Sequence, residues 1–264
     1  MKSLKGKTVW ITGASSGIGE ALAYELAREE AFLVLSARNR DKLEQVKNRC
    51  LESTSQCLIQ PVDMANIREL EDVTQAVLAQ TGGIDLLINN AGRSQRSLAK
   101  ETPLDVDRSV MELNFFGVVA LTKLVLPEML KKGSGHIVVV SSITGKFGFP
   151  LRTAYSASKH ALQGFFESLR AELKSEHIKV TIVSPGRIKT NISLNALTRD
   201  GTPYNKMDDG QAEGMDAGKC AEKIVKAIKK ERKELLIGQR ELLMVYFRRF
   251  VPALYHRLVT RIRN

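Results

Sequence analysis

The chain has 264 residues, of which 43% are hydrophobic and 26% are charged, so it is long enough to build one α/β domain with a substantial core. Its three cysteines and four histidines are scattered, which predicts no disulfide framework and no metal site, and fits a reducing, cytoplasmic compartment. No run of about eighteen apolar residues occurs, so we expect neither a signal peptide nor a membrane-spanning helix.

Short apolar segments alternate with amphipathic helical segments along the chain. This alternation predicts a Rossmann-type, doubly wound parallel sheet of about seven strands in a single domain. Ligands of such sheets bind at the C-terminal ends of the strands. We expect the strands at residues 7–12, 32–36, 56–61, 84–88, 135–141, 178–183 and 234–237.

The first predicted strand runs directly into a glycine-rich turn and an amphipathic helix. Glycines at such a turn let the backbone approach a pyrophosphate, and the helix N-terminus offers free N–H groups to the phosphates. An ordinary glycine-rich strand-to-helix turn is the alternative. If the turn binds a dinucleotide, we expect contacts from Gly13, Ser15, Ser16, Gly17, Ile18 and Gly19.

The second predicted strand ends at Ser36, and in dinucleotide-binding folds the residues after this strand contact the adenosine ribose. An acidic residue here would bind a free 2'-hydroxyl, whereas this chain has Arg38, a planar cation suited to a 2'-phosphate. The position therefore favours NADP(H) over NAD(H). The alternative is that Arg38 is a solvated loop arginine.

Tyr155 and Lys159 are four residues apart, so on a helix they share one face. A free tyrosine titrates near about 10, and a neighbouring ammonium stabilises its phenolate. The pair is therefore suited to proton transfer. An isolated Tyr-x-x-x-Lys on a solvated helix is the alternative, and only the accompanying motifs argue against it.

These motifs are the glycine turn, Asn89-Asn90-Ala91-Gly92, Asn114, Ser142 and the Tyr155/Lys159 pair. In this order and spacing the chain resembles the classical short-chain dehydrogenase/reductase family, from about Lys5 to Gly238. Residues 154–166 look most like the subgroup that includes steroid and retinoid dehydrogenases.

The resemblance implies four catalytic residues. Tyr155 would exchange the proton with the substrate oxygen while hydride passes to or from the nicotinamide, and Ser142 would hold the same oxygen. Ser141 is the nearest rival, and the spacing to Tyr155 favours Ser142. Lys159 would lower the pKa of Tyr155 and bind the nicotinamide ribose, and Asn114 would hold a water in the proton path.

The resemblance also implies further cofactor contacts. Asp63 would contact the adenine, although a role as a helix N-cap is the alternative. The remaining contacts would come from the turn after the fourth strand and the loop after the sixth, namely Asn90, Ala91, Gly92, Pro185, Gly186, Ile188 and Thr190.

The C-terminal region carries most of the net charge of +11, because residues 219–264 hold 13 Lys and Arg against 4 Glu. We divide the chain into a dinucleotide-binding domain at 1–238 and a basic amphipathic extension at 239–264. A helical wheel of the extension places Arg248, Arg249, His256, Arg257 and Arg263 mainly opposite an apolar side made of Leu243, Phe247, Phe250, Val251, Leu254, Leu258 and Ile262. This side either packs on the chain's own domain or a second subunit, or contacts an anionic membrane surface. Nucleic acid is not expected.

Together these features predict an NADP(H)-dependent oxidoreductase that interconverts a carbonyl and a secondary alcohol. Residues 94–96, 147–151 and a mobile lid at 191–214 would line the substrate site, and Phe147 and Phe149 favour an apolar steroid-, retinoid- or lipid-like substrate. The alternatives are a 3-oxoacyl-carrier-protein reductase and a catalytically silent nucleotide-binding protein. The resemblance and the apolar run at 115–126 also predict a homodimer or homotetramer.

Overall fold

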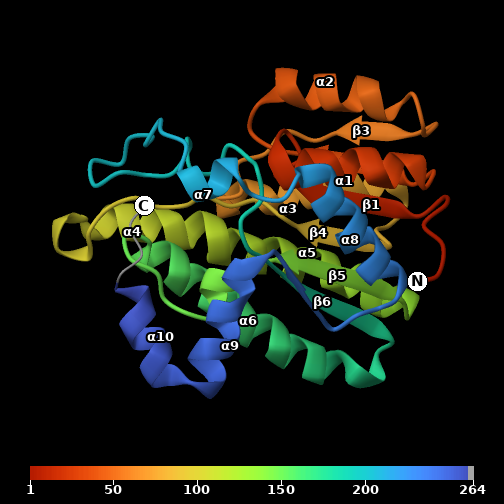
Figure 1. Ribbon diagram of the computed structural model, residues 1–264. Coiled ribbons are helices and arrows are strands. Elements are labelled where there is room, and N and C mark those ends of the chain that lie inside the picture. Colours follow the sequence, from red (N-terminus) through yellow and green to blue (C-terminus); the bar gives the residue numbers. More distant parts are fainter. Residues whose placement is uncertain (261–264) are drawn as a thin grey trace.

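A seven-stranded parallel sheet forms the centre of the computed structural model, which describes residues 1–260 (Figure 1). The strand order is β3-β2-β1-β4-β5-β6-β7, and it reverses direction between β1 and β4. The predicted Rossmann-type fold is therefore confirmed, and each expected strand is present, those at 32–36 and 234–237 with the expected ends and the others with slightly different ends. The strands are β1 (Thr8–Thr12), β2 (Phe32–Ser36), β3 (Cys57–Ile59), β4 (Leu86–Asn89), β5 (Gly135–Val140), β6 (Ile178–Pro185) and β7 (Glu234–Ile237).

Helices cover both faces of the sheet (Figure 1). One apolar core joins the sheet to α1 (Gly17–Arg28), α2 (Arg40–Cys50) and α8 (Ala217–Lys229). The other joins it to α3 (Ile67–Thr81), α5 (Gly117–Lys132) and α6 (Thr153–Glu172). In β1, Val9 and Ile11 enter the first core and Trp10 enters the second, because successive side chains of a strand point to opposite faces. Burial on both faces explains the nearly continuous apolar strands.

Residues 104–132 form one long helical segment, made of α4 (Leu104–Met111), a π-helical stretch at Glu112–Phe116 and α5. By length and composition this segment is apolar enough to cross a membrane. The segment meets this criterion although polar residues interrupt its apolar runs, which is why a search for uninterrupted runs does not find it. A core helix meets the same criterion, and here α5 packs against α3 while α4 packs against α6.

The C-terminal residues form α9 (Leu243–Phe250) and α10 (Pro252–Val259), which pack near the Phe147 loop. The Tyr255 side chain is buried, and its hydroxyl donates a hydrogen bond to the Gly148 carbonyl at 2.7 Å. Phe247 also packs inward, whereas Phe250 and Leu254 are exposed. The apolar side predicted by the helical wheel is therefore divided, because Phe247 packs on the domain while Phe250 and Leu254, placed on the same side by the wheel, face solvent. Ile262 and Arg263 lie outside the described residues.

Candidate active site

A cleft of about 1670 Å³ runs along the C-terminal ends of the strands. Drug-sized ligands occupy pockets of roughly 300 to 1,000 Å³, so this cleft has room for a dinucleotide and a second ligand. Of the predicted site residues, Gly19 and Asn114 do not line the cleft. The other predicted cofactor contacts line it, together with Ser142, Tyr155 and Lys159.

The glycine turn between β1 and α1 has the geometry that close backbone approach requires. Gly13 and Gly17 have φ angles of 65° and 61°, which residues other than glycine rarely adopt. A Cβ on Gly19 would lie 2.2 Å from the Gly13 carbonyl oxygen, so Gly19 serves turn-to-helix packing from behind the cleft. The side chain of Ser16, the N-cap of α1, makes no capping hydrogen bond. The turn therefore fits a dinucleotide pyrophosphate.

Asn90 closes this turn from the end of β4. Its side-chain amide donates to the carbonyls of Thr12 and Gly13 at 3.1 and 3.2 Å. Asn90 thus holds the turn in shape through its side chain, while Ala91 and Gly92 line the cleft beside it.

The end of β2 presents cations to the cleft. Ser36 faces the core, where its hydroxyl accepts a hydrogen bond from the Trp10 indole at 2.9 Å, and the exposed Arg38 lines the cleft. Lys42 and Arg93 line the same region, and burial together with the charge of Arg38 lowers the pKa of Arg93. Lys42 and Arg93 were not predicted from the sequence, although Lys42 stands only four residues after Arg38.

Asp63 lies on the same side of the cleft, after β3. Its Oδ1 atom accepts a hydrogen bond from the Ala65 backbone at 3.0 Å, and the N-cap of α3 is Asn66. Asp63 therefore shapes the turn ahead of the helix without capping it, and its side chain remains beside the cleft.

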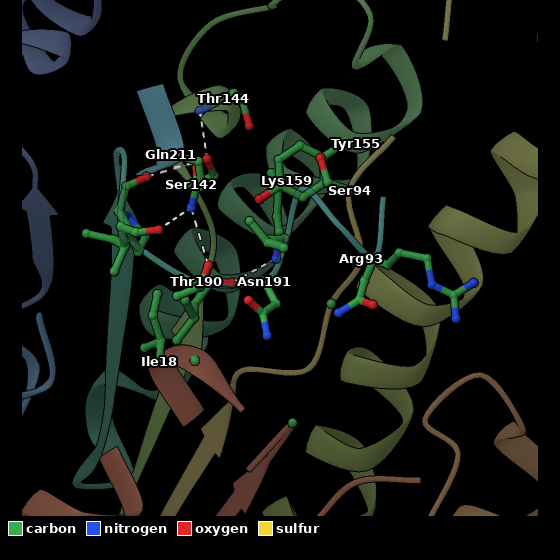
Figure 2. A pocket seen from close by; sticks show the side chains of 18 of the residues that line it. Ile18, Arg93, Ser94, Ser142, Thr144, Tyr155, Lys159, Thr190, Asn191 and Gln211 are labelled. Atoms are coloured by element: carbon green, nitrogen blue, oxygen red, sulfur yellow. Dashed lines mark hydrogen bonds between the residues drawn. The ribbon is translucent and has the colours of Figure 1, made fainter. Parts of the chain in front are cut away.

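Tyr155 and Ser142 lie together in the cleft, from α6 and the end of β5 (Figure 2). Burial raises the pKa of Tyr155, while a hydrogen bond with Ser142 and the positive charges of Arg96 and Arg152 act in the opposite direction. The charges of the two arginines thus favour the phenolate form of Tyr155. Arg96 was expected from the sequence only as part of a lining loop, and Arg152 was not expected, although it stands just before α6.

Lys159 lies one turn after Tyr155 on α6, with its ammonium 5.8 Å from the centre of the tyrosine ring. The ammonium donates to the Val140 carbonyl at 2.9 Å, and burial lowers the pKa of Lys159 to about 8. A Cβ on Gly92 would lie 3.3 Å from this ammonium, so a small residue is needed there. Lys159 is therefore held at the floor of the cleft.

Asn114 lies behind the cleft in the π-helical stretch, a feature that often marks functional sites. Its side-chain amide donates to the Arg93 carbonyl at 2.9 Å and to the Ser158 hydroxyl at 3.0 Å, and its oxygen accepts from the Arg93 N–H at 2.8 Å. Asn114 thus links the residue after Gly92 to α6.

The loop after β6 completes the cleft with Pro185, Gly186, Ile188 and Thr190. Glu241, from the C-terminal extension, accepts a hydrogen bond from the Arg187 N–H at 2.9 Å. The Gln211 side chain donates to the Ile188 carbonyl and to the Thr190 hydroxyl. The extension and the 191–214 segment thus both hold this loop.

Comparison with known proteins places these features in context. Residues 7–200 match the family model described as short chain dehydrogenase. The chain is 44% identical to "Dehydrogenase/reductase SDR family protein 7-like" of Drosophila melanogaster, over 96% of this chain and 79% of the relative. It is 42% identical to "Dehydrogenase/reductase SDR family member 7B" of Mus musculus, over 97% and 81% of the two chains.

Solved structures share the fold over nearly the whole chain. A short-chain dehydrogenase from Streptomyces avermitilis has a TM-score of 0.82 and 28% identity, with 96% of this chain and 95% of that chain covered. A short-chain dehydrogenase/reductase from Burkholderia phymatum, solved in complex with NAD, has a TM-score of 0.85 and 24% identity, with 96% of each chain covered.

Proposed function

The chain belongs to the short-chain dehydrogenase/reductase family of oxidoreductases, and from this premise we propose that it interconverts a carbonyl and a secondary alcohol with NADP(H). The observation that carries the proposal is that Tyr155, Ser142 and Lys159 line one cleft, which begins at a dinucleotide-type glycine turn. A bound nicotinamide would accept or supply the hydride.

The proposed roles of the side chains follow from their positions. Tyr155 exchanges the proton with the substrate oxygen, and Ser142 donates a hydrogen bond to the same oxygen. Lys159 holds the floor of the cleft through Val140 and carries a positive charge below its pKa of about 8. Asn114 orders the backbone at Arg93 and so connects α6 to the cofactor side.

The preference for NADP(H) is supported by the charges at the end of β2. Arg38, Lys42 and Arg93 line the cleft together, and residues 36–40 include no carboxylate. A 2'-phosphate would bring negative charge to this cluster, whereas a 2'-hydroxyl would gain little from it.

The substrate is proposed to have an apolar body. Phe147 and Phe149 line the cleft with their rings 6.4 Å apart, and Met244 of the extension lies beside them. A steroid-, retinoid- or lipid-like carbonyl fits this lining. A 3-oxoacyl-carrier-protein reductase remains the alternative, because a basic surface suits an acidic carrier.

Two assembly proposals accompany this activity. Exposed Leu104 and Phe116 on the 104–132 segment suggest pairing with a second copy of the chain as a dimer or tetramer. Exposed Leu243, Tyr246, Phe250, Val251 and Leu254 are interspersed with exposed arginines, which favours peripheral contact with an anionic membrane.

Consumption of NADPH and NADH against ketones and aldehydes graded by chain length and ring count tests the activity. Tyr155→Phe keeps the ring but removes the proton donor, so turnover should fall by about 100-fold or more while NADPH still binds. Unchanged turnover in this variant would refute the mechanism. Reduction of 3-oxoacyl carrier protein, with none of the ketones and aldehydes reduced, would instead favour a 3-oxoacyl-carrier-protein reductase.

A further inference from the structure

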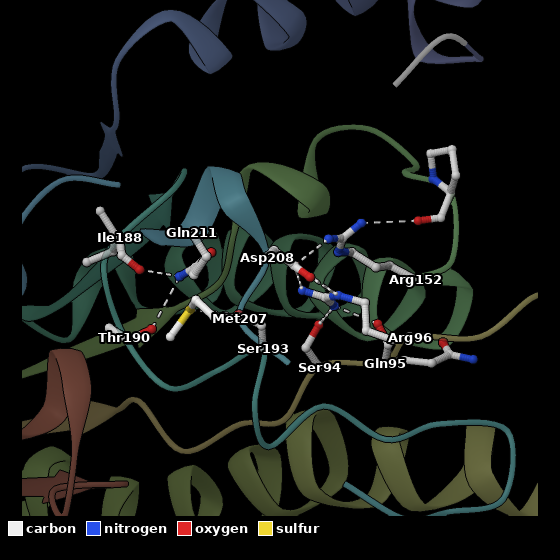
Figure 3. Close-up of polar contacts among 11 residues, drawn as sticks. Ser94, Gln95, Arg96, Arg152, Ile188, Thr190, Ser193, Met207, Asp208 and Gln211 are labelled. Carbon is white, nitrogen blue, oxygen red and sulfur yellow. Dashed lines mark hydrogen bonds and ion pairs between the residues drawn. The ribbon is translucent and has the colours of Figure 1, made fainter. Parts of the chain in front are cut away.

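Two buried arginines and one aspartate meet inside the cleft (Figure 3). Arg96 follows β4 by a short loop, Arg152 directly precedes α6, and Asp208 directly precedes the short helix α7 (Asp209–Ala212). Their side chains are 4%, 11% and 10% exposed, respectively. Charged side chains are rarely buried to this extent, so the cluster needs an explanation beyond surface charge.

Both arginines direct N–H groups at one carboxylate oxygen. Nε of Arg96 donates to Asp208 Oδ2 at 3.0 Å, and its Nη2 donates to the same oxygen. Nη2 of Arg152 reaches that oxygen at 3.0 Å. The Asp208 carboxylate therefore occupies an anion-binding position formed by two guanidinium groups.

The arginines are fixed in place independently of Asp208. Nη1 of Arg96 donates to the Ser94 hydroxyl at 2.7 Å and to the Gln95 carbonyl at 2.6 Å. Nη1 of Arg152 donates to the Pro150 carbonyl at 3.2 Å, and the guanidinium lies 4.6 Å from the centre of the Phe149 ring. Leu151, between these residues, has a φ of 62°, a strained conformation for leucine that is typical of functional sites.

Asp208 lies between two anchored parts of the 191–214 segment, since Leu197 exchanges backbone hydrogen bonds with Ser94 and Arg96, and Gln211 donates to the Ile188 carbonyl. The hydrogen bonds that join Asn205 to Leu194 and Tyr204 to Ala196 lie within the same 191–214 segment. Met207 beside Asp208 is exposed, and α7 has only four residues. Between these two anchors, the contacts of Asp208 with the arginines therefore hold residues 205–210 over the cleft.

The cluster is close to the proposed proton donor. Arg96, Arg152, Asp208, Tyr155 and Phe149 line the same cleft, and the charges of both arginines act on the pKa of Tyr155. If the segment opens for a neutral substrate, Arg96 and Arg152 lose a buried carboxylate without replacement, which is strongly unfavourable. A substrate with its own anion would replace the lost contact.

We propose that the substrate carries a carboxylate or phosphate that takes the place of the Asp208 carboxylate on Arg96 and Arg152. This inference rests on the proposed function and refines its substrate to an amphipathic acid, with an apolar body and an anionic group. Displaced Asp208 moves into water, and the segment that it fastens opens to admit the substrate. The two arginines then select for the anion.

The test uses phenyl ketones with a carboxylate at graded distances from the carbonyl, each paired with its methyl ester and with a phosphate monoester of the same length. We expect kcat/KM of the full-length enzyme with NADPH to be at least about tenfold higher for an acid than for its ester. The better of the carboxylate and phosphate series identifies the anion. Equal rates for all acids and esters would overturn the inference but keep the proposed function, whereas no reduction of any ketone would refute the proposed function.

Variants locate the selectivity. Arg96→Gln should reduce the acid-to-ester ratio towards one, mainly through KM of the acid, while Arg28→Gln, an exposed arginine paired with Glu25, should leave the ratio unchanged. Asp208→Asn removes the competing carboxylate. It should lower KM for the acid more than KM for the ester. If Arg96→Gln fails to bind NADPH, the Asp208→Asn result decides, and an unchanged acid KM there would overturn the inference.

Hydrogen exchange gives a readout that does not depend on turnover. Adding the preferred acid with NADP⁺ should accelerate exchange at residues 205–213 of the unaltered enzyme, because the segment loses the ion pairs of Asp208. The methyl ester should not do so. Protection of this segment by the acid would contradict the proposed displacement of Asp208.

Discussion

Ser141 and Ser142 are adjacent at the end of β5, but their hydroxyls serve different parts of the structure. Ser141 donates to the Lys159 carbonyl at 3.0 Å and accepts from Gln163 at 3.0 Å, so it is committed to α6. Ser142 accepts from the Thr144 N–H at 3.1 Å and donates to the Pro185 carbonyl at 3.5 Å, and it lines the cleft together with Tyr155, whose pKa it lowers. The geometry thus distinguishes two residues that the sequence separates only by spacing.

This difference predicts opposite effects of two matched variants. Ser142→Ala should lower kcat by roughly 100- to 1,000-fold, the cost of losing one donor to the reacting oxygen, with little change in stability. Ser141→Ala should cost about 1 kcal/mol of unfolding free energy and leave kcat nearly unchanged. Steady-state kinetics and urea unfolding measure both. A kcat loss confined to Ser141→Ala would reverse the assignment.

Much of the fold and of the candidate site could be predicted from sequence because the signals are local. Buried strands such as Thr8–Thr12 read as apolar runs, and the glycine turn identifies its strand and helix. The Asp208 contacts had no such signal, because Asp208 is 112 residues from Arg96 and 56 from Arg152. Only the path of the 191–214 segment brings them together.

Cofactor preference should depend on Arg38. NADP(H) should bind more tightly than NAD(H), and Arg38→Ala should weaken NADP(H) binding by about 1 to 3 kcal/mol, which is roughly 5- to 150-fold. NAD(H) affinity should change little. Fluorescence titration of both cofactors measures this, with Arg40→Ala as the control, since Arg40 is a neighbouring arginine outside the cleft lining. Equal affinity of the unaltered protein for both cofactors would refute this role.

His136 should make stability depend on pH. Its Nε2 lies 2.8 Å from the Thr181 hydroxyl, which donates to the Arg232 carbonyl, so Nε2 carries the proton and Nδ1 has no partner among the described residues. Burial lowers the pKa of His136 to about 4. Between about pH 4 and 6.5 the unfolded state therefore binds more protons, and stability falls as pH falls through this window.

Protonation of His136 in the unfolded state should lower the free energy of unfolding by up to about 3 kcal/mol at pH 4. Urea unfolding at several pH values should show that His136→Gln reduces the slope of stability against pH in this window. His256→Gln, at an exposed position, should keep the slope of the unaltered protein. The variants must be compared because acid also destabilises the protein through carboxylates such as Asp85, whose pKa the Lys132 ammonium lowers. Identical slopes in all three proteins would exclude His136 as a source.

The 104–132 segment should form the contact between subunits. Leu104 is 60% and Phe116 is 47% exposed, although both lie on a largely apolar helix. Leu104→Glu with Phe116→Glu should convert a dimer or tetramer into a monomer in sedimentation at micromolar concentration, because a charge in an apolar interface loses its hydration. Leu51→Glu, at an exposed leucine after α2, should not change the mass. A monomeric unaltered protein would contradict the prediction.

The exposed apolar side of the extension should bind anionic vesicles. Tyr255 already fastens α10 to Gly148, and Glu241 holds the loop at Arg187, so removing the whole extension would also disturb the cleft. Point variants avoid this problem. Phe250→Ser with Leu254→Ser removes apolar contact area, and Arg248→Gln with Arg249→Gln removes charge, in each case at exposed side chains.

Sedimentation with vesicles separates the two contributions. The unaltered protein should sediment with anionic vesicles at low salt and be released as salt rises, since each arginine near the surface contributes about 1 kcal/mol that salt screens. The serine variant should bind less at every salt concentration, and the glutamine variant should lose mainly the salt-dependent part. Ketone reduction should persist in both, because none of the four residues lines the cleft. If the unaltered protein does not bind anionic vesicles at low salt, this apolar side does not contact lipid. We would then expect it to bind a second protein surface.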